Sequence, residues 1–445
     1  MTADRLLRVL TLSDYNTRVV MFGTVMLGIA GGVVGTYLLL RRRALLADAI
    51  SHAALPGVAV AFIASVALGG SGRSLPVLLI GAAAFGLLGI LVVQAITKHT
   101  RLSQDAALGI VLSVFFGFGT ALLGIIQKMR GVQSTGLNSF IYGKTASMIR
   151  SDAILIGVAA AAALLLAALL FKEFRLFTFD PAFAASDGWP VHRLDLLLMS
   201  LVLVITVLGL QAVGIVLVIA LLIVPPASAR FWTDELRVMV LLSGLIGAMG
   251  AYVGTAISAL APRLPAGAVI VAVLGAAFVA SFLFGGSRGV VRMTVVRRDM
   301  IRRTLRQNLL RALYEAEESG ESHDAAGQMR YLHAARGWSA AALRRTLRRL
   351  SRAHLLYRIA DGPWLFTRAG RLEAIRVTRN HRLWEVYLLE HADTAAAHVD
   401  QAADSIEHVL GDALVAELEE ALPRFGKPLP PSIHTLAGRD PGGGA

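Results

Sequence analysis

The sequence contains no cysteine in its 445 residues, and only 16% of them are charged. The absence of cysteine excludes disulfides, thiolate metal sites and thiol catalysis. A water-soluble protein carries about a quarter charged residues. Because 56% of this chain is hydrophobic, we exclude a soluble single-domain enzyme and expect several membrane spans.

Apolar runs of about 20 residues, the length that crosses a bilayer, recur along the first two thirds of the chain. They predict about nine membrane helices, over residues 19–40, 44–68, 76–97, 105–127, 152–171, 193–210, 212–230, 236–260 and 264–284. The first run is followed at once by Arg41–Arg43 and has no small-residue cleavage site, so we do not expect a cleaved signal peptide.

Lys and Arg in the short connections predict the orientation of the spans. If the Arg41–Arg43 turn is cytoplasmic, alternation places most of the basic connections inside, although residues 128–151 are basic on the opposite side. The same alternation places the C-terminal part, which holds eight of the eleven histidines, in the cytoplasm.

Asp48 and His52 are ionisable residues within the second predicted span. They lie four positions apart, so both side chains project from one helix face, where a carboxylate oxygen and an imidazole nitrogen can bind a divalent transition metal. The alternative is an ion pair at the helix end. We also expect Pro56-Gly57 to interrupt this helix locally, as in spans that line a transport cavity.

The segment from Arg42 to Gly57 resembles the signature of manganese/zinc/iron-type permeases of ATP-binding-cassette importers. Two further segments, residues 179–188 and 210–229, resemble that family's ATPase-docking loop and later core spans. The resemblance covers residues 18–292 and implies a homodimeric or heterodimeric permease of a bacterial inner membrane. It matches Asp48 and His52 to the metal pathway for Mn, Zn or Fe. It also implies a cytoplasmic ATP-binding subunit and an extracytoplasmic metal-binding protein as partners.

Residues 179–188 also have a physical interpretation of their own. Asp180 as N-cap and Pro181 at the first helical position predict a short helix, with Phe179 and Phe183 exposed for a soluble partner and Gly188 following. The alternative is a connecting helix on the bilayer surface. Gly143-Lys144-Thr145 copies the end of a phosphate-binding loop, but Asn138 replaces the glycine that such a loop requires. We therefore expect a transport subunit that is not an enzyme, with ATP hydrolysed by a separate subunit.

The C-terminal part changes to amphipathic patterns. Helices are expected over 299–318, 325–335 and 339–350, with Ser339 as an N-cap, followed by a β-hairpin over 355–359 and 364–367. This order is typical of a winged helix-turn-helix. The third helix carries candidate DNA-phosphate contacts at Arg344, Arg345, Arg348 and Arg349, with a solvated face or a face on anionic lipid as alternatives.

This part resembles the diphtheria-toxin-repressor type of metal-dependent regulators over residues 299–434, through Leu310–Glu315, Thr367–Arg371, His381–Glu385 and Glu407-His408. The resemblance implies primary-site metal ligands at Asp404, Glu407 and His408, and ligands of a neighbouring site at His381 and Glu385. The alternative for these charged residues on polar helices is surface salt bridging. Asn308 and Asp400 depart from the family pattern.

The sequence therefore predicts an all-α polytopic membrane protein with a cytoplasmic winged helix-turn-helix and a helical metal-binding and dimerisation domain. The expected boundaries are 1–292, 293–371 and 372–434, with a disordered tail over 435–445. The leading hypothesis is a metal permease whose regulator-like domain gates transport or binds DNA after release. A membrane-tethered transcriptional regulator and an exporter or channel for another substrate are the alternatives.

Overall fold

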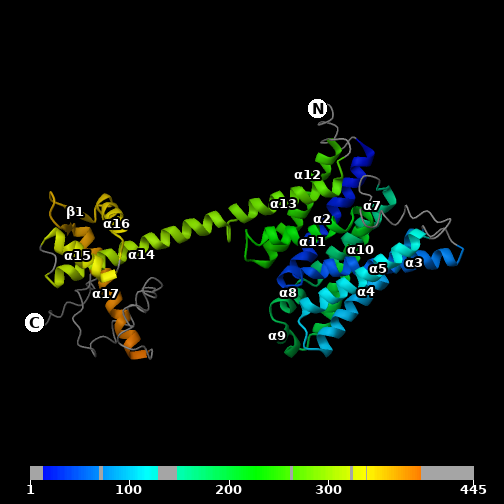
Figure 1. Ribbon diagram of the computed structural model, residues 1–445, viewed down its shortest axis with the longest axis horizontal. Helices are drawn as coiled ribbons and strands as arrows, with labels where there is room; N and C mark the ends of the chain where they lie inside the picture. The colour runs from blue at the N-terminus through cyan, green and yellow to red at the C-terminus, as the bar shows by residue number, and fades with distance from the viewer. Residues whose placement is uncertain are drawn as a thin grey trace, which may run out of the picture. The chain divides into compact units, whose positions relative to one another are not determined.

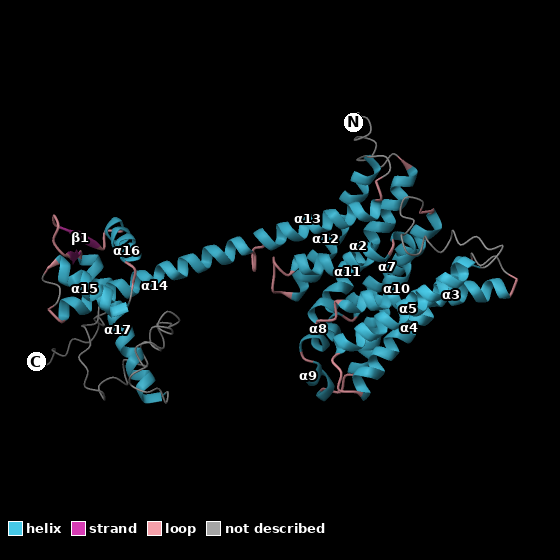
Figure 2. Cartoon of the chain, in the orientation of Figure 1, coloured by secondary structure: helices cyan, strands magenta, loops and turns pink. Residues whose placement is uncertain are grey.

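The computed structural model describes residues 14–69, 74–128, 148–260, 264–320, 324–336 and 338–391 of the chain. Among these residues, the only sheet is one two-stranded hairpin, and nearly everything else is helical (Figures 1 and 2). The chain divides into two compact units, Met1–Met293 and Thr294–Ala445. The tail over 435–445 and the Gly143–Thr145 segment lie outside the described residues.

The first unit is a bundle of apolar helices. Eight of those described are long and apolar enough to cross a bilayer: α2 (Tyr15–Leu40), α3 (Leu45–Ala67), α4 (Leu75–His99), α5 (Gln104–Lys128), α7 (Arg150–Leu169), α10 (Val191–Val213), α12 (Leu236–Leu260) and α13 (Ala266–Phe284). The polytopic all-helical fold expected from the sequence is confirmed.

The predicted span over 212–230 differs from expectation. Gly214 has a φ of +87°, which ends α10 at Val213 and leaves α11 (Ile215–Ala229) with 15 residues. At ~1.5 Å per residue this helix is about 22 Å long, short of the ~30 Å hydrocarbon core. Helix α11 packs against α2, α12 and α13 inside the bundle.

Two packing groups organise the unit. Helix α2 packs against α7, α11 and α12, and α3 packs against α4 and α5 (Figure 1). Between α7 and α10 lie two short helices, α8 (Phe171–Phe179) and α9 (Pro181–Ser186).

The second unit contains the helix order expected from the sequence. Helices α14 (Val290–Glu318), α15 (Ala325–Arg336) and α16 (Ala340–Arg352) precede strands β1 (Leu356–Arg358) and β2 (Trp364–Phe366) and helix α17 (Arg368–His391). The strands pair antiparallel with Tyr357 opposite Leu365. Leu309 and Leu313 of α14 pack with Leu343 and Leu347 of α16 in a buried core. Helix α14 begins at Val290, earlier than the predicted residue 299.

Candidate functional site

Asp48 and His52 lie together near the start of α3. The His52 Nε2 atom is 3.3 Å from the Asp48 Oδ1 atom, and both side chains are partly buried. Two ligands ~2.1 Å from one ion are separated by about 3.0 Å at a right angle and about 3.4 Å at the tetrahedral angle. The two atoms are therefore spaced to bind one divalent ion, and they are also close enough to form an ion pair without it.

The surroundings of His52 leave one of its nitrogens unused. Its Nδ1 atom is buried and has no hydrogen-bond partner among the described residues. The imidazole ring stands edge-on to the Phe116 ring of α5, with 4.8 Å between centroids. Within the same part of the chain, no group of three or more His, Asp or Glu residues is placed to hold a metal. The pair therefore offers two ligands and no closed cage.

The expected break at Pro56-Gly57 is wrong, because α3 runs unbroken from Leu45 to Ala67. Packing against α4 and α5 holds the helix through the proline. Pro56 has no N–H to donate to the carbonyl of His52, four residues earlier, so the helix continues with one hydrogen bond fewer beside the pair.

The Arg41–Arg43 turn that leads into α3 is fixed to two other elements. Arg41 donates to the carbonyl of Phe177 at 2.9 Å and stacks on its ring at 3.8 Å, while Arg43 donates to Gln104 at 3.0 Å. Both guanidiniums contact the Asp195 carboxylate at the start of α10. Burial lowers the pKa of Arg41, as does the neighbouring charge of Arg43, whereas Asp195 opposes the shift.

Sequence reasoning missed Asp195 as a functional candidate. Asp195 is a 9% exposed carboxylate in an apolar helix, and buried ionisable residues in spans are functional candidates by default. We call Asp195 and the two arginines the Asp195 anchor. Through Phe177, it joins α8 to the turn that precedes Asp48.

The segment from Phe179 to Gly188 has the predicted local structure. The Asp180 side chain accepts a 2.9 Å hydrogen bond from the Phe183 backbone N–H and caps α9 at its start, where Pro181 is the first residue. Phe179 and Phe183 are exposed at 62% and 56%. Gly188 has a φ of +84°, in the left-handed region that favours glycine. Phe174 and Phe177 on α8 are fully buried and fix the segment to the bundle.

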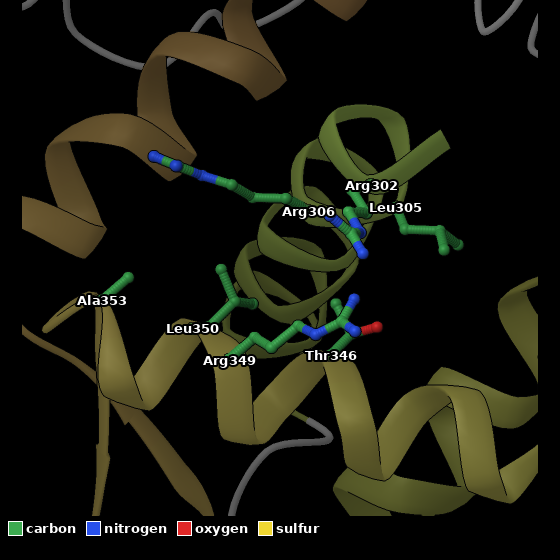
Figure 3. A pocket seen from close by; sticks show the side chains of 7 residues that line it. All are labelled: Arg302, Leu305, Arg306, Thr346, Arg349, Leu350 and Ala353. Atoms are coloured by element: carbon green, nitrogen blue, oxygen red, sulfur yellow. The ribbon is translucent and has the colours of Figure 1, made fainter. Parts of the chain in front are cut away.

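The arginines predicted on α16 are all exposed, but only one of them borders a hollow. Arg349 borders a hollow of about 410 Å³ between α14 and α16, together with Arg302 and Arg306 of α14. In Figure 3, Arg302 and Arg349 point toward one another, whereas Arg306 reaches toward α17, where it pairs with Glu373 at 3.6 Å. Arg344, Arg345 and Arg348 do not line this hollow. The predicted N-cap is present, because Ser339 accepts from the Ala342 N–H at 3.3 Å.

The candidate regulatory metal ligands are described only in part. His381 is buried on α17, whereas the Glu385 side chain and residues Asp400, Asp404, Glu407 and His408 lie outside the described parts of the structure. Asn308 on α14 is buried, and its Oδ1 atom has no hydrogen-bond partner among the described residues.

Eight membrane-length helices indicate a polytopic membrane protein, in which α3 carries the Asp48–His52 pair and a capped, phenylalanine-bearing helix lies between two of the spans. Residues 13–285 match the ABC 3 transport family, and the chain belongs to that family. Residues 367–427 match the metal-binding and dimerisation domain of the iron-dependent repressors. The expected fusion of a permease with a repressor-like domain is confirmed.

Relatives named as metal transporters are similar over most of the chain. The manganese transport system membrane protein MntC of Bacillus subtilis (strain 168) is 37% identical over 392 residues, which are 88% of each chain. The zinc transport system membrane protein TroC of Treponema pallidum (strain Nichols) is 42% identical over 63% of this chain and 92% of its own. A chain of PsaBC from Streptococcus pneumoniae, solved in complex with Fab, matches with a TM-score of 0.56 and 30% identity over 66% of this chain and all of that one.

Proposed function

We propose that the chain is the permease subunit of an ATP-binding-cassette importer for a divalent transition metal, Mn, Zn or Fe. The observation that carries this proposal is the 3.3 Å separation of Asp48 Oδ1 and His52 Nε2 on one face of α3. The names of the manganese and zinc relatives support the same substrate class.

A site with two protein ligands is better suited to passing a metal ion on than to holding it. A transported ion must shed water, bind and leave again, so a site with few protein ligands releases it more readily than a closed four-ligand site. Water or the second permease subunit, identical or not, completes the coordination. An extracytoplasmic metal-binding protein delivers the ion.

The energy for transport comes from a separate cytoplasmic ATP-binding subunit. That subunit binds the exposed Phe179 and Phe183 of the 179–188 segment. Asp180, Pro181 and Gly188 fix the backbone conformation of this segment. The Asp195 anchor supports this arrangement, because it joins α8, which precedes the docking helix, to the turn that carries α3.

A comparison of metal uptake tests the proposal. Asp48→Ala and His52→Ala, each in the full complex with its ATPase in proteoliposomes, are expected to lower uptake of the preferred metal among Mn, Fe, Zn and Co. His192→Ala removes an exposed histidine at the start of α10 and serves as the control. Unchanged uptake by both pair variants would contradict the proposal and favour an exporter or channel for another substrate.

The cytoplasmic C-terminal part is proposed to sense metal through His381, Glu385, Asp404, Glu407 and His408. The family match over residues 367–427 supports this role. The sensor either gates transport or binds DNA after proteolytic release, with Arg344, Arg345, Arg348 and Arg349 contacting phosphates. Direct repression by the tethered chain is the second candidate, since the exposed arginines of α16 and the hollow at Arg302 favour phosphate binding.

Metal-dependent DNA binding separates release from direct repression. We expect fragment 293–445 to bind DNA more tightly than the full chain, because the membrane restricts its search. Equal metal-dependent affinities for the two proteins would remove the need for release. Arg345→Ala and Arg348→Ala are expected to weaken binding and its dependence on salt.

A further inference from the structure

A second hollow lies beside the docking segment in the membrane unit. It has a volume of about 480 Å³ and is bounded on one side by the α8–α9 segment and on the other by the connection between α11 and α12. The lining residues relevant here are Arg175, Phe179, Asp180, Asp234, Glu235 and Arg237. Phe179 and Asp180 therefore belong both to the docking segment and to this hollow.

The wall formed by the α11–α12 connection is firmly held. Asp234 pairs with Arg230 at 3.2 Å and accepts hydrogen bonds from Ser287 Oγ at 2.6 Å and from Arg288 at 2.7 Å. The backbone N–H groups of Ser287 and Arg288 also donate to the Phe231 carbonyl, at 2.9 and 3.0 Å. We call the Asp234, Arg230, Ser287 and Arg288 contacts the Asp234 clamp. A wall fixed in this way offers a partner a preformed surface, which lowers the entropic cost of binding.

The charges of the hollow are not equally available to a partner. One oxygen of Asp180 caps α9, and Asp234 is engaged in the clamp. Arg175 and Arg237 are exposed, and no ion pair or side-chain hydrogen bond involves either of them in the part of the chain that the structure describes. Together with the exposed Phe179 ring, the hollow presents two available guanidiniums and one apolar surface, beside the exposed carboxylates of Glu235 and Asp180.

We infer that the surface for the ATP-binding subunit extends from α9 into this hollow, which receives a segment of that subunit carrying a carboxylate beside an apolar side chain. The inference rests on the proposed function, because it extends the docking segment. Exposed guanidiniums that face a carboxylate favour the correct partner and speed its association, and a like charge at the same place opposes it.

Binding of the purified ATP-binding subunit to the full-length permease in nanodiscs tests this surface. Arg237→Glu and Arg175→Glu are each expected to weaken binding about tenfold, through like-charge repulsion. Arg101→Glu makes the same charge change in the exposed α4–α5 connection and is expected to leave binding unchanged. Added salt should weaken the wild-type complex more than the Arg237→Glu complex. Arg237 forms no contact of the clamp, so its replacement does not disturb the fold of the connection.

The outcomes separate this inference from the proposed function. If Phe183→Ala weakens binding while Arg237→Glu and Arg175→Glu bind like the wild type, docking through α9 stands and its extension into the hollow is overturned. If Phe183→Ala also binds normally, the proposed docking segment is wrong. An equal loss for Arg101→Glu would show a general charge effect and would overturn the inference as well.

Discussion

Asp195 is a buried carboxylate that compensates two arginines at the end of α2. Side-chain exposure is 12% for Asp195 and 14% for each of its partners, Arg41 and Arg43. Removing one partner of a buried ion pair leaves an uncompensated charge away from water, which is much more costly than losing an exposed pair. We therefore expect loss of the Asp195 carboxylate to destabilise the fold more than loss of a carboxylate from an exposed ion pair.

Replacement of Asp195 tests this difference. Asp195→Asn is expected to destabilise the fold by on the order of 3 kcal/mol, because two guanidiniums lose their carboxylate. Asp299→Asn removes the partner of Arg302 from a pair in which both side chains are more than half exposed, and should cost less than about 1 kcal/mol. Thermal unfolding in detergent measures both variants. Equal losses would contradict a structural role for the anchor.

Among single residues, the sequence predicted contacts between neighbours in one helix turn and missed contacts between residues far apart in the chain. The spacing of Asp48 and His52 and the cap at Asp180 follow from helix geometry, so residue numbers suffice. Asp195 lies far from Arg43 in sequence, and only packing of α10 beside the turn brings them together. The unpartnered His52 Nδ1 atom likewise depends on which side chains surround it.

Helix α3 carries the pair on a closely packed backbone. A Cβ atom on Gly57 would lie 2.1 Å from the carbonyl oxygen of Gly81 on α4, a contact that only a shift of backbone can relieve. The two helices can approach this closely only because neither residue has a side chain. The position of Asp48 and His52 therefore depends on Gly57 as well as on the helix itself.

A glycine substitution tests the packing of α3. Gly57→Ala is expected to destabilise the unit by about 1–3 kcal/mol and to lower uptake, because overpacking moves α3. Gly275→Ala on α13 is the matched control, since its Cβ would meet nothing within 4 Å. Thermal unfolding and metal uptake are measured for both. A neutral Gly57→Ala with a destabilising Gly275→Ala would contradict this account.

The order of elements was more predictable than their ends. Hydropathy identifies the spans because every backbone polar group in lipid must be paired within a helix. It places the division between α10 and α11 near residue 211, whereas the left-handed φ of Gly214 sets it about three residues later. The start of α14 at Val290 was missed because residues 290–301 are exposed in the structure, so no buried face marks this part of the helix. The expected break at Pro56 was wrong because tertiary packing outweighed a local rule.

On the scale of the whole molecule, α14 is the element common to both units. Its first residues follow the Asp234 clamp directly, and Leu309 and Leu313 near its other end belong to the core of the C-terminal unit. The clamp joins the residues just before this helix to a wall of the hollow beside the docking segment. If the C-terminal part gates transport as proposed, we expect a rotation of α14 to act on the clamp and, through it, on that wall.

The contacts of the Asp234 clamp do not change with pH near neutrality. The hydrogen bond from Ser287 is the main cause that lowers the pKa of Asp234. Desolvation, the next largest effect, raises it, and the charge and hydrogen bond of Arg288 and the charge of Arg230 lower it further. A carboxylate with a lowered pKa keeps its stabilising contacts above the usual aspartate range and loses them only as the pH falls below it. Protonation of Asp234 therefore does not open the clamp near neutrality, and metal bound by the C-terminal unit is the expected signal.

Weakening the clamp from the side of α14 tests the route without substituting a residue that lines the hollow. In the reconstituted complex we expect excess cytoplasmic metal to lower ATP hydrolysis by the wild type. Ser287→Ala combined with Arg288→Gln should weaken that response, because Asp234 then loses both side-chain contacts with the residues before α14, while the backbone hydrogen bonds to Phe231 remain. Arg292→Gln changes an exposed arginine on the same helix and should keep the response. A wild type without any response would favour release and DNA binding over gating. A double variant that responds like the wild type would show that the signal does not pass through the side-chain contacts of Asp234 with Ser287 and Arg288.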